Sequence, residues 1–130
     1  MIRNRQAKAQ VGEVFICDLL EKAKWTILAR NFRTTGSELD IVAKKGETIA
    51  VVEVKLRSPG GLTHIDVSDL LPHRKVKALT RGFYRFISKQ EHLGYSTARI
   101  DLALVGLSES NAPSLLNYWS HATEFVSLDD

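Results

Sequence analysis

The spacing of apolar positions separates the chain into helical and extended segments. In residues 11–24, apolar side chains recur at three- to four-residue intervals without an internal Pro, which is typical of an amphipathic helix. Residues 25–33 are rich in β-forming side chains and predict a short strand before the turn-forming residues 34–37. We therefore expect a helix followed by a strand in this part of the chain.

Two β-rich runs, 38–43 and 48–56, are separated by residues 44–47. Gly46 in this linker tolerates the positive φ that a tight hairpin turn requires. The second run, TIAVVEVKL, is apolar on both faces over much of its length, which is typical of a strand covered on both sides. The pattern predicts a β-hairpin whose second arm is a central strand.

A second helix is expected over residues 70–89, where Pro72 is tolerated because it falls near the start. Helical periodicity places its apolar and basic side chains in opposite sectors. The apolar sector contains Val76, Leu79, Phe83, Phe86 and Ile87. The basic sector contains Arg74, Lys77, Arg81 and Arg85, with Lys75 at the border. One side of this helix should therefore pack on a sheet, and the other should face water or a partner.

Residues 98–107 predict another buried strand, and residues 115–126 predict a weaker one. The resulting order of elements indicates an α/β fold in which a mixed β-sheet is flanked by helices. A length of 130 residues and a hydrophobic content of 44% are typical of one compact domain. We expect residues 1–130 to form that single domain, with residues 1–10 as a basic extension.

The single cysteine, Cys17, cannot form a disulfide within the chain, and without a Cys/His cluster a zinc site is not expected. No uninterrupted apolar run approaches the ~18 residues of a membrane span. The first ten residues are not followed by the apolar stretch of a secretion signal. We therefore expect a cytoplasmic protein without a membrane partner.

The net charge of +3 is small, but the basic residues are unevenly distributed. Residues 74–90 contain six Lys or Arg residues and no acidic residue. Such a local positive field favours a polyanion, and we expect nucleic acid, with DNA preferred, to contact Arg74, Lys77, Arg81 and Arg85. The alternative interpretation is a solvated helix face.

Glu53 lies within an apolar strand, where an ionised carboxylate needs a compensating partner. If the hairpin loop has an even number of residues, for instance with Lys45 and Gly46 at its tip, Glu38 lies across from Glu53. Asp40, Glu53, Lys55 and Glu38 then project from one face of the sheet. A one-residue change of register would separate Asp40 from Glu53.

Acidic side chains this close together repel each other unless a cation joins them. Mg²⁺ prefers oxygen ligands and typically takes one or two carboxylates, which Asp40 and Glu53 could supply. Lys55 and Lys75 would then hold or deprotonate a polarised water and balance the charge of a phosphate. The alternative is a salt-bridge ladder on an exposed sheet face, in which Glu38 and Glu53 pair with Lys55 and neighbouring Arg residues.

The string Glu38-Leu39-Asp40, then twelve residues, then Glu53-Val54-Lys55, resembles the D-x(n)-(D/E)-x-K signature of the PD-(D/E)xK nucleases. A longer ordered set of blocks resembles the small YraN-like proteins, which are related to archaeal Holliday junction resolvases. These blocks are Gly12-Glu13, residues 27–33, residues 38–42, residues 52–57, Lys75 and residues 99–101. The resemblance extends from about Gly12 to Val105.

The resemblance implies a restriction-endonuclease-like core with elements in the order αβββαβ. It implies a Mg²⁺ or Mn²⁺ site at Asp40 and Glu53, with Lys55 as the catalytic lysine. It further suggests Glu13 and Glu38 as supporting acids, and Lys75 as a second basic group. Ser37 stands where relatives usually carry Gly, which places an altered turn next to Glu38.

Two residues outside these motifs have alternative interpretations. Asp101 should be a structural partner of Arg99 or of a backbone N–H, with metal ligation as the alternative. Tyr118 should pack in the core, although it could also stack on a nucleic acid base.

Together these features predict a metal-dependent endonuclease that hydrolyses DNA phosphodiester bonds, at branched or single-stranded structures. A non-catalytic nucleic-acid-binding module on the same fold is one alternative, and a structural domain with an acidic protein partner is another. A homodimer would suit symmetric cutting of a branched substrate, although the sequence itself does not show one.

Overall fold

A computed structural model of the chain describes residues 4–58 and 65–129. Its helices are α1 (Arg5–Lys22), α2 (Val67–Leu70) and α3 (His73–Ser88). Its strands are β1 (Thr26–Thr34), β2 (Ser37–Lys45), β3 (Thr48–Arg57), β4 (Thr97–Leu107) and β5 (Pro113–Thr123). The Pro-Gly-Gly sequence of residues 59–61 predicts a loop over residues 58–62, and apart from Ser58 this loop lies outside the described residues. No helix in the described part of the chain has the length and apolar character needed to cross a bilayer.

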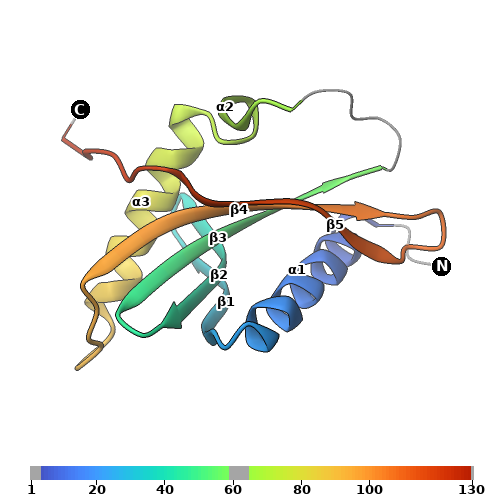
Figure 1. Ribbon diagram of the computed structural model, residues 1–130. Helices are drawn as coiled ribbons and strands as arrows, with labels where there is room; N and C mark the ends of the chain where they lie inside the picture. Colours follow the sequence, from blue (N-terminus) through green and yellow to red (C-terminus); the bar gives the residue numbers. More distant parts are fainter. Residues whose placement is uncertain (1–3, 59–64, 130) are drawn as a thin grey trace.

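The five strands form one sheet in the order β1-β2-β3-β4-β5. β3 and β4 are parallel, whereas the other neighbouring pairs are antiparallel. Helices α1 and α3 cover opposite faces of this sheet (Figure 1). The predicted mixed sheet with flanking helices is confirmed. β5 corresponds to the weaker strand predicted over residues 115–126, and α2 adds to the predicted elements.

Two predicted helix boundaries are wrong. Helix α1 begins at Arg5, where the side chain of Asn4 accepts a hydrogen bond from the Ala7 N–H at 2.6 Å. Residues 5–10 are good helix formers without an apolar stripe, so hydrophobic periodicity alone did not indicate them. The second predicted helix is divided, because Pro72 disfavours helical geometry at Leu71 and instead precedes the first turn of α3.

The two faces of the sheet have separate hydrophobic cores. Leu39, Val51 and Leu102 pack with the apolar side of α3, and the predicted Val76, Leu79, Phe83 and Phe86 are buried there. Ile41, Val52 and Val105 pack with α1 on the opposite face. Because side chains alternate along β3, Glu53 and Lys55 lie on the α3 side and Val54 lies on the α1 side.

The β2–β3 hairpin has a two-residue turn of Gly46 and Glu47, with φ of 59° at Gly46. An even-numbered turn is confirmed, but the suggested tip at Lys45 and Gly46 is wrong because Lys45 pairs with Thr48. Leu39 packs on the α3 face and Ile41 on the α1 face, so β2 changes face at Asp40. The expectation that Glu38 projects from the same face as Glu53 and Lys55 is therefore wrong, and the expected pairing of Glu38 with Glu53 is not among the described strand pairs. The regular ladder stops at Ile41 and Val52, so the two strands separate next to the two acidic residues.

Candidate active site

A cluster of acidic side chains surrounds the point at which β2 and β3 separate. Asp40 belongs to β2, Glu53 to β3, and Glu13 to the middle of α1. They share a cavity of about 430 Å³ with Glu38, Asn31, Arg33 and the side chains of the first two turns of α1. The structure therefore brings together all four acids that the sequence predicted for the site.

Glu53 is an almost completely buried carboxylate, with only 3% of its surface exposed. Its Oε2 atom forms ion pairs with Lys55 Nζ at 3.2 Å and with Lys75 Nζ at 3.1 Å. Its Oε1 atom is buried and has no hydrogen-bond partner among the described residues. The two lysines thus compensate one oxygen and leave the other available for a further partner.

Beyond the point where the β2–β3 ladder ends, the Val54 N–H donates a hydrogen bond to a side chain instead of to the neighbouring strand. The acceptor is Asp40 Oδ2, at 3.0 Å. Burial, followed by the nearby charge of Glu53, raises the pKa of Asp40 to about 8, while the bond from Val54 acts against this. At neutral pH the group is therefore largely protonated unless a cation approaches. A cation between Asp40 and Glu53 would favour the ionised form of both.

Glu13 approaches the same cavity from α1. It is buried, and within the described part of the chain its Oε1 atom has no hydrogen-bond partner. Burial raises the pKa of Glu13, whereas a hydrogen bond with Asn31 lowers it. Asn31 has a left-handed backbone with φ of 52° and lies opposite Asp40, since Arg30 pairs with Ile41 and Phe32 pairs with Leu39.

Glu38 lies nearer the solvent at the rim of the cavity. Its Oε1 atom is 3.2 Å from the Nε atom of Arg33. The Glu38–Arg33 and Glu53–Lys55 ion pairs are those expected from the alternative interpretation, a salt-bridge ladder. That alternative requires an exposed sheet face, however, and the burial of Glu53 with one oxygen unpaired does not match it.

A basic groove adjoins the acidic cluster on the α3 side. It is a cavity of about 500 Å³ that lies between β3 and the start of α3. Its charged lining consists of Lys55, Arg57, Arg74 and Lys75, with Asp69 as an acidic member. Lys75, at the border of the basic sector of α3, thus reaches Glu53 on β3, while Arg57 is an addition from the block that follows Lys55.

The remaining predicted basic residues follow α3 away from this groove. The guanidinium of Arg85 donates to Thr34 Oγ1 at 3.0 Å and to the backbone oxygen of Thr35. Arg85 therefore connects α3 to the β1–β2 turn. Arg81 lies near Gly36 of the same turn, and Lys77 occupies an intervening, partly buried position.

The acidic cluster fits a hard divalent cation by the chemistry of its donors. Two neighbouring carboxylates, one with an unpaired buried oxygen, match the one or two carboxylates that Mg²⁺ typically takes. Among residues 4–58 and 65–129, no three His, Cys, Asp or Glu side chains form a ready metal cage. A cation here would depend on Asp40, Glu53, water and backbone oxygen atoms.

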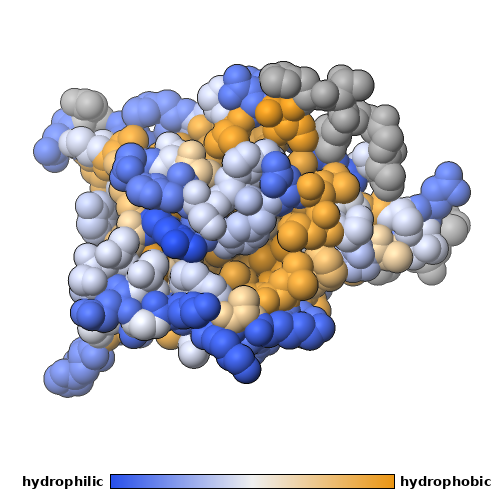
Figure 2. Space-filling view, in the orientation of Figure 1, coloured by the Kyte–Doolittle hydropathy of each residue, from blue (hydrophilic) through white to orange (hydrophobic). Residues whose placement is uncertain are grey.

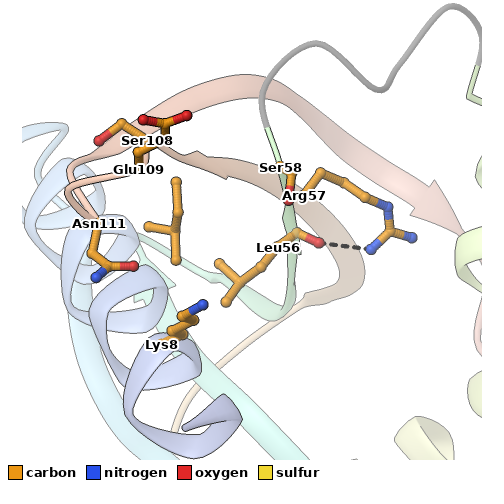
Figure 3. Close-up of a pocket in the computed structure, with 8 residues that line it drawn as sticks. Lys8, Leu56, Arg57, Ser58, Ser108, Glu109 and Asn111 are labelled. Carbon is orange, nitrogen blue, oxygen red and sulfur yellow. Dashed lines mark hydrogen bonds between the residues drawn. The ribbon is translucent and has the colours of Figure 1, made fainter. Parts of the chain in front are cut away.

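A separate cavity of about 470 Å³ lies near the ends of β3 and β4 (Figure 3). Lys8 of α1 and Glu109 and Asn111 of the β4–β5 turn surround it. Glu109 is its single acidic member, so this cavity lacks the paired carboxylates of the candidate site.

Asp101 has a structural role, as the sequence suggested. It contacts Arg99 Nε at 3.0 Å and Tyr118 Oη at 2.5 Å, and it accepts the His121 N–H at 2.9 Å. Both carboxylate oxygens are therefore occupied. The ring of Tyr118 packs against the core on the α1 side.

Comparisons with known proteins agree on one family. A family model described as "Uncharacterised protein family UPF0102" matches residues 12–105. A UPF0102 protein of Synechococcus sp. (strain JA-3-3Ab) is 33% identical over 92% of this chain and 91% of its own length. Another from Trichlorobacter lovleyi is 38% identical over 87% of each chain. A third from Geobacter metallireducens is 35% identical over 75% of this chain and 77% of its own.

Proposed function

We propose that this chain, which belongs to the UPF0102 family of YraN-like proteins, hydrolyses DNA phosphodiester bonds with the help of Mg²⁺ or Mn²⁺. The observation that carries the proposal is the buried pair of Asp40 and Glu53. One oxygen of Glu53 contacts two lysines, and the other has no hydrogen-bond partner in residues 4–58 and 65–129. A structural ion pair would not require this arrangement, whereas a site for a cation beside a phosphate would use it.

Asp40 and Glu53 would hold the cation. When bound, it would stabilise negative charge on the phosphate and lower the pKa of a coordinated water. Glu13, with its own unpaired buried oxygen, would orient water in the same cavity, and Glu38 would support the site from the rim. The positions of the four side chains around the shared cavity support these proposed roles.

Lys55 and Lys75 separate the acidic cluster from the basic groove. Their ammonium groups contact Glu53 from the groove side. Lys55 would orient the attacking water and stabilise charge on the phosphate, and Lys75 would hold a phosphate oxygen. Arg57 and Arg74 line the groove beyond them and would bind neighbouring phosphates of the same strand.

A cleavage assay tests the catalytic proposal. Purified wild-type chain with Mn²⁺ should nick plasmid DNA or cut branched and single-stranded oligonucleotides, and EDTA should stop the reaction. Asp40→Asn and Lys55→Ala should each reduce the rate at least 100-fold, as is typical for groups that stabilise developing charge. Glu21→Gln, an exposed acid of α1, should leave the rate unchanged.

Equal cleavage by the wild type, Asp40→Asn and Lys55→Ala would contradict the mechanism. Calorimetric titration with Mn²⁺ in the absence of DNA gives a second measurement. The wild type and Lys55→Ala should both bind the ion, whereas Asp40→Asn should bind it at least tenfold more weakly. Binding that Asp40→Asn leaves unchanged would place the cation elsewhere.

The basic groove also favours a second candidate, a non-catalytic nucleic-acid-binding module. Its charged lining of four cations and one acid would attract a phosphate backbone without any metal. This candidate predicts DNA binding in EDTA that Asp40→Asn does not weaken. Absence of cleavage by the wild type, together with such binding, would favour it over the nuclease.

A further inference from the structure

Asn31 has an unusual backbone for a residue inside a strand. Its φ of 52° lies in the left-handed region, which residues other than Gly rarely adopt, although Asn does so more readily than most. Lys24, His92 and Asn111 also have a positive φ, but they lie in the turns and loops between elements. Among the described residues, Asn31 and His121 are the non-glycine residues within strands that have a positive φ. The extended geometry of β1 is therefore interrupted at Asn31.

β1 changes face at this interruption. Side chains of a regular strand alternate between the two faces of the sheet. Ala29 packs on the α3 face, so a regular strand would place Phe32, three residues later, on the α1 face. The ring of Phe32 instead contacts the ring of Phe86 on α3, with the two centroids 5.3 Å apart. The alternation of β1 is thus broken between Ala29 and Phe32, where Asn31 has its left-handed backbone.

β2 changes face at the residue that lies opposite Asn31. Leu39 packs on the α3 face and Ile41 on the α1 face, although residues two apart in a regular strand share a face. The change therefore falls at Asp40. Asn31 and Asp40 oppose each other because the β1–β2 pairs on both sides of them keep one register. The φ of Asp40 is not positive, so the left-handed backbone of this pair belongs to Asn31.

The change of face brings Asp40 within reach of α1. Hydrophobic side chains gather over α1 and β5 in Figure 2, and the side chains that α1 packs on the sheet are mostly apolar. Glu13 is an exception, because it is a buried acid that lines the acidic cavity together with Asn31 and Asp40. Asp40 Oδ2 accepts the Val54 N–H at 3.0 Å in the same place. Regular alternation from Ile41 would instead direct the side chain of residue 40 to the α3 face, away from Glu13.

We infer that Asn31 is a positioning residue: its left-handed backbone turns β1 and β2 together and thereby holds the carboxyl group of Asp40 between Glu13 and the Val54 N–H. The inference rests on the proposed function, in which Asp40 is one of the two carboxylates assigned to the cation. Asn combines two properties that suit this position, since it tolerates the left-handed region and its side chain forms a hydrogen bond with Glu13. Asn31 thus acts through Asp40, without contacting the phosphate.

Substitution by Gly and by Ala separates the backbone of Asn31 from its side chain. Both variants lack the carboxamide, but Gly adopts the left-handed region freely and Ala does not. Asn111, between β4 and β5, is the matched control because its φ is 63° and it lines the separate cavity near the ends of β3 and β4. At both positions the Ala variant should have a thermal midpoint about 3–6 °C below that of the Gly variant.

Hydrogen exchange at the Val54 amide, measured by NMR in EDTA, reports the position of Asp40 without metal or DNA. The amide should be protected in the wild type and in Asn31→Gly, because its bond to Asp40 persists. Asn31→Ala should increase its exchange at least tenfold relative to the other buried amides of β3, whereas Asn111→Ala should not. Calorimetric titration with Mn²⁺ should give the same order, with affinity at least tenfold weaker in Asn31→Ala and less affected in Asn31→Gly.

Equal protection of the Val54 amide in Asn31→Ala and in the wild type would overturn the inference. A loss of protection as large in Asn31→Gly as in Asn31→Ala would also overturn it, because the side chain rather than the backbone would then position Asp40. The exchange measurement decides this inference even if the wild type binds no Mn²⁺, a result that would contradict the proposed nuclease alone.

Discussion

Glu53 shows how a few residues can determine the electrostatics of a site. Lys55 and Lys75 contact one oxygen of Glu53, and this makes its ionised form acceptable inside the protein. Among the described residues, no Lys or Arg forms an ion pair with Asp40. Its ionised form is therefore disfavoured both by burial and by the charge of Glu53. Asp40 is consequently largely protonated at neutral pH.

This protonation predicts how stability depends on pH. The pKa of Asp40 is raised to about 8 in the folded state from an ordinary value of 3.8. Between these values the folded state binds a proton that the unfolded state lacks, so Asp40 contributes less stability as pH rises. In EDTA, the free energy of unfolding should decrease from pH 5 to pH 8 more steeply for the wild type than for Asp40→Asn, as measured by urea denaturation.

The same protonation makes cation binding dependent on pH. Mn²⁺ should displace the proton of Asp40, so its affinity should increase as pH rises towards 8. Asp18→Asn, which removes an exposed acid of α1, should reproduce both wild-type pH profiles. Parallel stability profiles for the wild type and Asp40→Asn would show that Asp40 is ionised in the folded protein.

The acidic motif could be predicted from the sequence, but parts of its surroundings could not. Asp40, Glu53 and Lys55 are conspicuous because charged side chains are unusual in buried strands. Asn31 carries a weaker signal: Asn adopts the left-handed region more readily than other non-glycine residues, but hydrophobic periodicity does not reveal that it does so within this β-forming run. Arg57 belongs to the block of residues 52–57 that resembles YraN-like proteins, but the sequence does not indicate that its side chain lines the basic groove.

At the scale of elements, the distance between α3 and β2 depends on Gly82. A Cβ atom at this position would lie 2.2 Å from Ser37 Oγ and 2.9 Å from Leu39 Cδ2. Gly82→Ala should therefore destabilise the protein, by roughly 1–3 kcal/mol in urea denaturation, because overpacking exceeds the gain in helix propensity. Gly94→Ala, where a Cβ would meet nothing within 4 Å, should change stability much less.

A substitution at Ser37 tests whether a steric clash causes the loss of stability expected in Gly82→Ala. Its hydroxyl donates to the Ala78 oxygen at 2.7 Å, and it is the closest atom to the added methyl group. Ser37→Gly should therefore rescue part of the loss in Gly82→Ala, and the double variant should be more stable than the sum of the single effects predicts. Strict additivity would indicate that Ser37 is not the limiting contact.

The elements could be predicted well where local patterns determine them, and less well where tertiary contacts do. Periodicity indicated the apolar face of α3 and the hairpin of β2 and β3. The hairpin tip was wrong by one residue, because the Lys-Lys-Gly-Glu linker permits two even-numbered turns. The separation of β2 from β3 beside Asp40 depends on a side-chain bond to Val54, which no local pattern indicates.

At the scale of the whole molecule, the small net charge conceals a separation of charge. The acidic cavity and the basic groove lie on either side of the contacts between Glu53 and its two lysines. The positive field extends from the groove along α3 through Arg74 and Arg81. We expect this part of the surface, rather than the overall charge, to determine the affinity for DNA.

Arg74→Glu combined with Arg81→Glu should therefore weaken DNA binding in EDTA and make it less sensitive to salt. Each lost phosphate contact lowers the slope of log affinity against log salt by about one, so the double variant should lower it by about two. Lys24→Glu combined with Lys45→Glu is the matched control, because it makes the same change in net charge at the opposite end of β3. Fluorescence anisotropy across a salt series measures both quantities. An equal loss of affinity in the two double variants would mean that net charge alone governs binding, and it would remove α3 from the proposed path of the DNA.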